Sequence, residues 1–149
     1  MESSLRTVIS QAFRSAAMRP TPQRYAVLEF LATRPVHATA EEIYSAVNRL
    51  DPRASRATVY NNLKSLTRAG LVREVASEGK AARFDANLNP HHHFVCDRCG
   101  SMEDIPWFDL DRTASSKFLE GRHVRTFDLV FRGTCRACFE STQVPEQKA

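Results

Sequence analysis

Residues 55–70, Ser-Arg-Ala-Thr-Val-Tyr-Asn-Asn-Leu-Lys-Ser-Leu-Thr-Arg-Ala-Gly, carry the pattern from which the fold of the first half of the chain follows. Val59, Leu63 and Leu66 recur at helical spacing and share one face, which we expect to be buried. Gly70 is typical of a residue that ends a helix. Side chains that step by four occupy another face: Arg56, Tyr60, Lys64 and Arg68. The stretch therefore predicts an amphipathic helix with one apolar and one basic face.

Three further helices are predicted before this one. Apolar residues at helical spacing indicate a helix within residues 3–17. Thr21-Pro22 marks the start of a second helix, because proline is favoured at the first helical position. Thr39 and Glu42 form a capping box that starts a third helix, and Asp51-Pro52 ends it.

A hairpin is predicted to follow the helices. Its strands are residues 71–75 and 81–85, separated by Ser77-Glu78-Gly79-Lys80. Helices followed by a basic-edged hairpin form a winged helix-turn-helix. We therefore predict a DNA-binding domain in residues 1–85 and a hinge in residues 86–90.

Charge is unevenly divided between the two parts of the chain. Residues 1–85 contain 13 lysines and arginines against 8 aspartates and glutamates, whereas residues 86–149 contain 8 against 9. A basic head on a near-neutral body suits a protein that binds nucleic acid. The alternative is a solvated basic surface without a specific partner.

The second part of the chain, residues 91–149, is predicted to be an α+β domain. Strands are expected at 93–95, 102–105 and 124–131, and a helix at 109–119 that Gly121 ends. The polar tail after Thr142 is expected to fray.

Membrane insertion and export are not expected from this sequence. No stretch approaches the roughly 18 apolar residues that a membrane span needs, and Met1-Glu2-Ser3-Ser4 does not begin a signal peptide. We expect a cytoplasmic protein, in which paired cysteines are more often metal ligands than disulfides.

Two C-x2-C pairs, Cys96-Cys99 and Cys135-Cys138, stand 36 positions apart. Such pairs are a strong signature of a structural Zn²⁺ site with four thiolates. Four thiolates leave no open position for water or substrate, which favours a structural role. The alternatives are two redox pairs or free thiols.

A second cluster with different chemistry precedes and follows the first cysteine pair. It comprises Asp85, the run His91-His92-His93, and Asp104. Imidazoles with carboxylates suit divalent ions such as Fe²⁺, Mn²⁺ and Zn²⁺. On a strand, His91 and His93 would point to the same side and His92 to the other. The alternative is a solvated turn.

These residues together resemble the ferric uptake regulator (Fur) family across nearly the whole chain. The matching stretches are residues 19–24 (Arg-Pro-Thr-Pro-Gln-Arg), 37–44 (His-Ala-Thr-Ala-Glu-Glu-Ile-Tyr), 57–60 (Ala-Thr-Val-Tyr) and 91–100. The resemblance implies a homodimer with an N-terminal winged helix and a C-terminal α+β dimerisation domain. It also implies that structural Zn²⁺ is bound by the residues that match its cysteine site, Cys96, Cys99, Cys135 and Cys138.

The resemblance further implies a regulatory Fe²⁺ or Mn²⁺ ion between the domains. Its implied ligands are His37, Asp85, His91, His93 and Asp104. His37 enters this set through the resemblance alone, because nothing in its own loop indicates a ligand. A further site of some relatives would use His92, Asp111 and Phe127, and we do not expect it here, because phenylalanine cannot bind a metal.

Within the family, the chain is most similar to the peroxide-responsive (PerR) branch. Asp104 stands where iron-sensing members have glutamate, and Asn61 where iron regulators often have arginine. In that branch, hydrogen peroxide reacts at the ferrous ion and oxidises the histidines that match His37 and His91. The ion is then lost and the repressor opens, whereas Mn²⁺ supports DNA binding without that reaction. Such a sensor is consumed by its own reaction and is not an enzyme.

DNA contacts are expected from the recognition helix in the major groove. Tyr60 and Asn61 would lie near base edges, with Asn61 or Asn62 paired to adenine. Phosphates would be contacted by Arg56, Lys64 and Arg68. Two such heads on a two-fold dimer would bind an inverted repeat in double-stranded DNA.

Two other functions remain open at this point. One is a regulator of metal uptake that senses iron, manganese or zinc on the same fold without sensing peroxide. The other is a zinc hydrolase or deaminase, which would need an open metal position and a nearby glutamate, as in an H-x-E motif. The sequence disfavours the second, because Phe94-Val95 follows His93 and the cysteines form a closed set.

Overall fold

The computed structural model describes residues 2–34, 37–50, 52, 54–75, 81–109, 119–125 and 127–143. The chain divides into two compact units, Met1–Leu88 and Asn89–Ala149. We describe each unit by itself. Among the described residues, no helix is long and apolar enough to cross a membrane.

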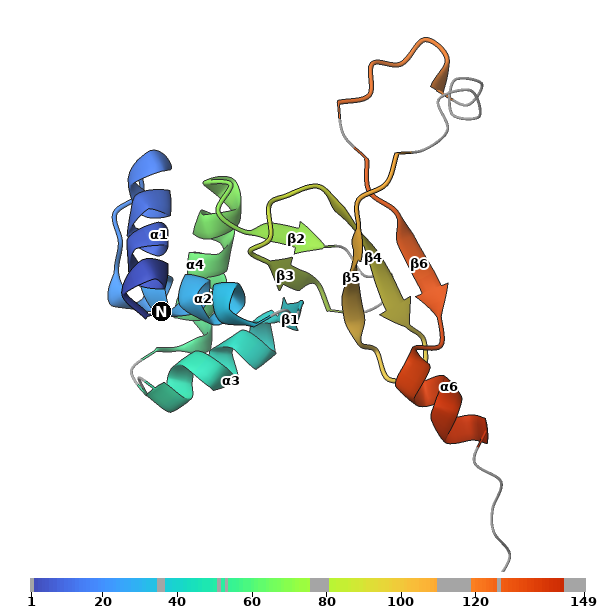
Figure 1. Cartoon of the computed structure of the whole chain (residues 1–149). Helices are drawn as coiled ribbons and strands as arrows, with labels where there is room; N and C mark the ends of the chain where they lie inside the picture. Colours follow the sequence, from blue (N-terminus) through green and yellow to red (C-terminus); the bar gives the residue numbers. More distant parts are fainter. Residues whose placement is uncertain are drawn as a thin grey trace, which may run out of the picture. The chain divides into compact units, whose positions relative to one another are not determined.

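Four helices make up most of the first unit: α1 (Glu2–Ser15), α2 (Pro22–Thr33), α3 (Ala40–Leu50) and α4 (Arg56–Arg68) (Figure 1). Local capping explains where they begin. Thr21 caps α2 by accepting a hydrogen bond from the Arg24 amide at 3.2 Å, and Ser55 caps α4 by accepting one from the Thr58 amide at 3.1 Å. These contacts satisfy amides that a helix start leaves unpaired.

The predicted capping box of α3 is present in both directions. The Glu42 amide donates to Thr39 Oγ1 at 3.2 Å, and the Thr39 amide donates to Glu42 Oε2 at 2.7 Å. After α4, Gly70 adopts a φ of +70°, a left-handed conformation that favours glycine. All four predicted helices are therefore confirmed, with ends that differ by a few residues.

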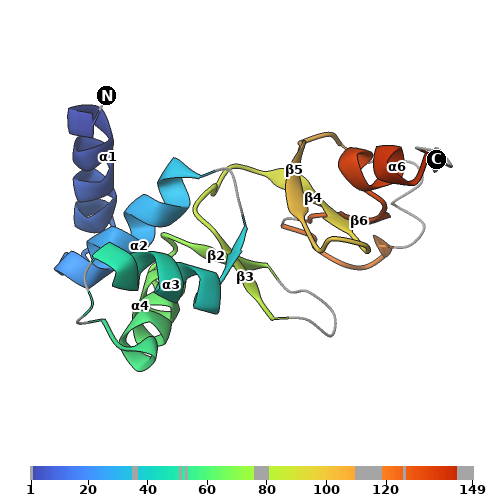
Figure 2. The ribbon, with the colours of Figure 1, turned by 90° about the horizontal axis from the view of Figure 1, so that it is seen from below.

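A three-stranded antiparallel sheet completes the first unit, in the order β1 (Ala38–Thr39), β3 (Arg83–Asp85), β2 (Arg73–Val75) (Figure 2). The two strands of the predicted hairpin are present, although shorter than expected. Its turn, residues 76–80, lies outside the described residues. Strand β1 was not expected, because two residues are too few to show an alternating pattern.

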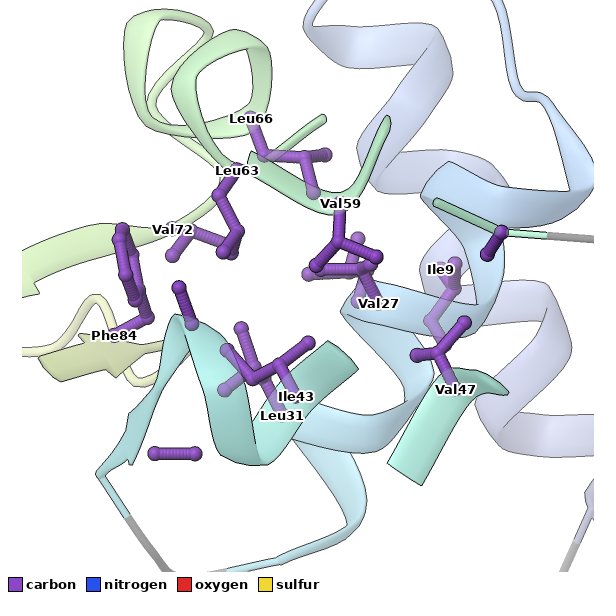
Figure 3. Packing of buried hydrophobic residues seen from close by; sticks show 14 of the residues in the cluster. Ile9, Val27, Leu31, Ile43, Val47, Val59, Leu63, Leu66, Val72 and Phe84 are labelled. Carbon is purple, nitrogen blue, oxygen red and sulfur yellow. The ribbon is translucent and has the colours of Figure 1, made fainter. Parts of the chain in front are cut away.

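One hydrophobic core joins the helices and the sheet of the first unit (Figure 3). Val59, Leu63 and Leu66 of α4 are each at most 1% exposed, so the predicted buried face is confirmed. They pack among apolar side chains from the other elements, including Ile9, Val27, Leu31, Ile43, Val47, Val72 and Phe84. The opposite face of α4, with Tyr60, Lys64 and Arg68, stays exposed.

The second unit is built on another three-stranded sheet, in the order β5 (Met102–Pro106), β4 (His91–Cys96), β6 (Val130–Gly133). Strand β4 pairs antiparallel with β5 and parallel with β6. Helix α6 (Arg136–Gln143) follows β6. The arrangement is the predicted α+β class.

The second unit differs from the sequence-based expectations in its last strand and its last helix. The strand predicted at 124–131 was too long, because β6 begins at Val130. Just before it, the Leu129 amide donates to the His92 ring rather than to a neighbouring strand. The helix predicted at 109–119 lies mostly outside the described residues. Helix α6 was missed, because its short sequence overlaps the second cysteine pair and has no clear apolar period.

Candidate functional site

The four cysteines come together at one end of the second sheet. Cys96 is the last residue of β4, and Cys135 immediately precedes α6. All four sulfurs lie within 4.8 Å of one another, and Cys99 Sγ is 3.8 Å from Cys135 Sγ. A tetrahedral zinc ion with bonds of about 2.3 Å would place its sulfurs about 3.8 Å apart. The donor set therefore fits Zn²⁺.

Backbone amides already favour a thiolate at Cys96. The Cys135 amide donates to Cys96 Sγ at 3.3 Å and the Cys99 amide at 3.5 Å. These hydrogen bonds lower the pKa of Cys96 to about 6. The neighbouring Cys135 thiol, then burial, raise the pKa of Cys138 to about 12. The amide donors thus favour the thiolate form of Cys96, which is the form that binds a divalent ion.

An arginine side chain also connects the two cysteine pairs by a hydrogen bond. Arg98 Nη1 donates to the Cys138 carbonyl at 3.0 Å, so a side chain within the first pair holds the backbone of the second. Ser101 Oγ lies 3.2 Å from Cys99 Sγ, and this hydrogen bond lowers the pKa of Cys99. The cluster is thus supported by polar contacts beyond its sulfurs.

A second donor group lies on the other side of β4 from His92. His91 and His93 are 4% and 0% exposed, and their Nε2 atoms are 3.0 Å apart. Asp104 pairs with His93 in the strand register, and its Oδ1 lies 3.6 Å from His91 Nε2. The structure therefore brings these three predicted ligands together.

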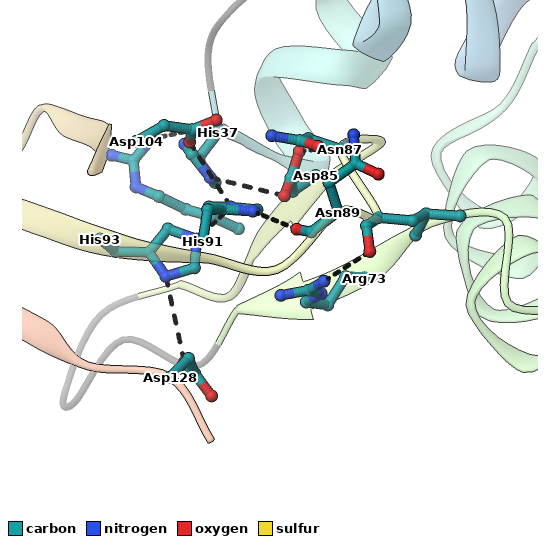
Figure 4. Close-up of polar contacts among 11 residues, drawn as sticks. His37, Arg73, Asp85, Asn87, Asn89, His91, His93, Asp104 and Asp128 are labelled. Atoms are coloured by element: carbon teal, nitrogen blue, oxygen red, sulfur yellow. Dashed lines mark hydrogen bonds and ion pairs between the residues drawn. The ribbon is translucent and has the colours of Figure 1, made fainter. Parts of the chain in front are cut away.

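The outward nitrogens of the two histidines face oxygen acceptors (Figure 4). His91 Nδ1 lies 2.7 Å from the Asn89 carbonyl, which can only accept, so Nδ1 carries the proton and Nε2 keeps its lone pair. His93 Nδ1 faces Asp128 Oδ2 at 4.0 Å, which is longer than a hydrogen bond. An oxygen acceptor behind a ligand imidazole, such as the Asn89 carbonyl behind His91, is the usual outer partner at a metal site.

His92 points the other way and is fully buried. The Leu129 amide donates to its Nδ1 at 3.2 Å, so Nε2 carries the proton and donates to the Phe108 carbonyl at 3.1 Å. Its ring stacks on Trp107 at 4.8 Å and on Phe127 at 5.7 Å. With both nitrogens engaged, His92 belongs to the packing of the unit.

The first unit carries a smaller donor pair. His37 and Asp85 are 5% and 8% exposed, and His37 Nε2 lies 3.8 Å from Asp85 Oδ2 (Figure 4). The Asn87 amide donates to Asp85 Oδ1 at 2.6 Å. Arg83 Nη1 donates to the His37 carbonyl at 2.6 Å. One imidazole and one carboxylate, both buried, are donors that suit a divalent ion.

The predicted DNA-contacting residues divide into two groups on α4. Tyr60, Asn61 and Lys64 are exposed, whereas Asn62 is half-buried. Arg56 is exposed but paired with Glu41 of α3: its Nη2 lies 2.7 Å from Glu41 Oε1. Arg68 is exposed as well. The structure therefore leaves four of the predicted residues, Tyr60, Asn61, Lys64 and Arg68, open to a ligand and engages Arg56 within the helix-turn-helix.

A comparison with protein families matches residues 15–131 to the ferric uptake regulator family. The chain belongs to the ferric uptake regulator family.

Similar Fur-family proteins include the peroxide-responsive repressor PerR of Staphylococcus epidermidis. It is 35% identical over 134 residues, which are 87% of each chain. The crystal structure of the Campylobacter jejuni peroxide stress regulator is 29% identical, with a TM-score of 0.65, covering 90% of this chain and 98% of that one. The ferric uptake regulator of Pseudomonas aeruginosa, solved with manganese, is 26% identical, with a TM-score of 0.64, covering 87% and 98%. The Fur-like fold and the similarity to PerR are thus both confirmed.

Several supporting residues of this Fur-family chain were not anticipated from its sequence. They are Arg83, Asn89, Arg98 and Asp128. Arg98 stands inside a C-x2-C pair, which is a signal that could have drawn attention to it. The sequence around the other three gives no such signal, because each contacts a histidine whose orientation is known only from the folded structure.

Proposed function

We propose that this chain is a homodimeric, metal-dependent transcriptional repressor that releases double-stranded DNA when hydrogen peroxide oxidises its ligand histidines. The observation that carries the proposal is the presence of buried imidazoles beside carboxylate donors in each unit. His37 and Asp85 belong to the first unit, and His91, His93 and Asp104 to the second. One Fe²⁺ or Mn²⁺ ion that uses both donor groups would couple the units, and its loss would uncouple them.

The zinc ion is proposed to have a purely structural role. Cys96, Cys99, Cys135 and Cys138 would hold it and so stabilise a unit whose sheet has three strands among the described residues. Small domains commonly need such a metal to complete their stability.

The exposed apolar side chains of the second unit support a homodimer. Among the described residues, β6 pairs only with β4, which leaves its other edge open. Large apolar side chains on the same unit are exposed: Trp107, Phe108, Leu119, Val124, Val130, Phe131 and Phe139. A second copy of the chain would cover them.

DNA binding is proposed for the exposed face of α4. Tyr60 and Asn61 would lie near base edges and Lys64 near phosphate, on a unit that carries most of the positive charge. Two copies on a two-fold axis would bind an inverted repeat.

In the sensing reaction, hydrogen peroxide would transfer one oxygen atom to a ring carbon of His37 or His91 and leave as water. The imidazole ring supplies the two electrons for this transfer, and a bound ferrous ion would activate the peroxide. His91 presents Nε2 because the Asn89 carbonyl holds its Nδ1–H. Oxidation of either ring removes a donor, and the remaining set binds the ion more weakly.

The test is peptide mapping of the Fe²⁺-loaded and Mn²⁺-loaded protein after dilute hydrogen peroxide, with DNA binding followed in parallel. We expect a gain of one oxygen at His37 or His91 in the iron form only, together with DNA release. His123 is exposed and serves as an internal control for oxidants free in solution. Oxidation of His123 as fast as His91 would contradict a metal-directed reaction.

The second candidate is a regulator of metal uptake on the same scaffold. It is favoured by the likeness to the Pseudomonas aeruginosa protein that was solved with manganese. Unmodified histidines, with DNA binding that follows metal occupancy alone, would establish this alternative.

A further inference from the structure

Strand β3 contacts His37 through two of its residues. Residues two apart on a strand share a side, so Arg83 and Asp85 face the same way while Phe84 enters the core. Asp85 faces the His37 ring, with Oδ2 3.8 Å from Nε2. Arg83 reaches the backbone of the same residue, and its Nη1 donates to the His37 carbonyl at 2.6 Å.

Arg83 also reaches the start of α3. Its Nη1 lies 3.6 Å from Glu42 Oε2, the oxygen that accepts from the Thr39 amide. Thr39 is the register partner of Arg83 across the β1–β3 pair. The guanidinium therefore connects the returning hairpin strand, the segment that carries His37, and the capping box of α3.

The environment makes this contact stronger than an ordinary surface hydrogen bond. The Arg83 side chain is 20% exposed, and the His37 side chain 3%. A charged donor to a carbonyl in partly buried surroundings forms a short and strong hydrogen bond. Arginine is suited to this role because its planar fork presents several donors at once, whereas lysine carries a single ammonium.

We propose that Arg83 is a positioning residue for the regulatory metal, acting through His37. By fixing the His37 carbonyl, it sets where the imidazole stands relative to the Asp85 carboxylate, which lies two residues farther along the same strand. This assignment rests on the proposed function, since it concerns the ion that His37 and Asp85 would hold. It predicts that metal affinity depends on a side chain that does not itself bind the metal.

The test compares Mn²⁺ affinity among variants of the full-length, zinc-loaded protein, measured from the electron paramagnetic resonance signal of free Mn²⁺. Loss of outer contacts to a metal ligand typically weakens metal binding by about 10- to 100-fold, and we expect a loss in this range for Arg83→Gln. Arg83→Lys keeps a cationic donor and is expected to recover part of the affinity. Glu42→Gln keeps an acceptor for the cap and is expected to bind Mn²⁺ within about twofold of the unchanged protein, since the Glu42 side chain is 57% exposed.

Arg73→Gln is the matched control. Arg73 lies on β2 opposite Asp85, and its side chain makes an exposed hydrogen bond of 3.2 Å to the Leu88 carbonyl. This variant removes an arginine of the same sheet without touching His37, so its Mn²⁺ affinity should change far less than that of Arg83→Gln. Thermal unfolding without added Mn²⁺ is measured for every variant, because a purely structural arginine would lower the unfolding temperature and leave the affinity of the folded protein unchanged.

The experiment distinguishes a failure of the proposed function from a failure of the role assigned to Arg83. If the unchanged protein shows no saturable Mn²⁺ binding that His37→Ala abolishes, the proposed function fails. If it binds Mn²⁺ in this way and Arg83→Gln binds as tightly as Arg73→Gln, the role of Arg83 is overturned while the proposed function stands.

Discussion

Arg56 and Glu41 form a two-point ion pair within the helix-turn-helix, with Arg56 Nη2 2.7 Å and Nε 3.2 Å from Glu41 Oε1. The guanidinium also lies 4.8 Å above the centre of the Tyr44 ring. The hydrogen bond from Arg56 lowers the pKa of Glu41, so the carboxylate stays charged at neutral pH. Arg56 therefore connects the start of α4 to α3.

This ion pair leads to a prediction about DNA binding. Each cation that neutralises a phosphate adds about 0.9 to the slope of log affinity against log salt concentration. Lys64→Gln should reduce the slope by about this amount on a random-sequence duplex. The double variant Arg56→Gln/Glu41→Gln removes a neutral pair and should leave the slope unchanged. A slope reduced by about 0.9 in the double variant would mean that Arg56 exchanges Glu41 for phosphate on binding.

Removing one zinc ligand should lower the stability of the second unit but not that of the first. In Cys138→Ser we expect loss of bound zinc, because three thiolates no longer close the tetrahedron. The N-terminal helices have their own core and should resist proteolysis. A colorimetric assay of released zinc measures the zinc content, and limited proteolysis measures which unit remains folded. Ser101→Ala, which changes a contact of Cys99 and no ligand, is the control and should retain zinc.

The shifted pKa values of the cysteines predict how many protons zinc displaces. At pH 7, Cys96 with a pKa of about 6 is largely thiolate, whereas Cys138 with a pKa of about 12 is a thiol. Zinc binding to metal-free protein should therefore release fewer than four protons, on the order of three. Calorimetry in buffers of different ionisation enthalpy measures this number. Release of four would mean that the amides of Cys135 and Cys99 do not stabilise the Cys96 thiolate.

The same shift sets a pH dependence for the metal-free fold. The folded-state pKa of Cys96 is depressed, so its contribution to stability is present above the unfolded value of roughly 8.5 and is lost as pH falls through about 6. Denaturant unfolding of the metal-free protein between pH 5 and pH 9 would measure this contribution to the free energy of unfolding. Stability that does not fall between pH 8 and pH 5 would contradict this prediction.

His92 and His93 are adjacent, yet replacing them should have different effects: one on stability and the other on Mn²⁺ binding. His92→Ala removes a fully buried ring with two hydrogen bonds and should lower the free energy of unfolding by about 3 kcal/mol. Its Mn²⁺ affinity, measured well below the unfolding temperature, should stay close to that of the unchanged protein. His93→Ala should abolish Mn²⁺ binding. Equal losses of Mn²⁺ affinity in the two variants would contradict the opposite orientations of the two rings.

Much of the fold could be predicted because its signals are local. A helix start needs a cap three residues from its partner, as at Thr39 and Glu42, and a buried helical face needs apolar residues three and four apart, as at Val59 and Leu63. Two C-x2-C pairs likewise predict a metal site, because the two cysteines of each pair lie in one turn and can bind the same ion. These features appear in the structure where the sequence placed them.

What the tertiary structure alone decided are the contacts between residues far apart in the chain. Arg83 meets the backbone of His37 across 46 positions, and the Leu129 amide turns to the His92 ring, so that β6 begins only at Val130. Such pairings have no period or spacing in the sequence, because they depend on how strands register and helices pack after the chain collapses. The sequence by itself determined which elements form and which residues can bind metal. Packing decided which of those residues face each other and which neighbours hold them in place.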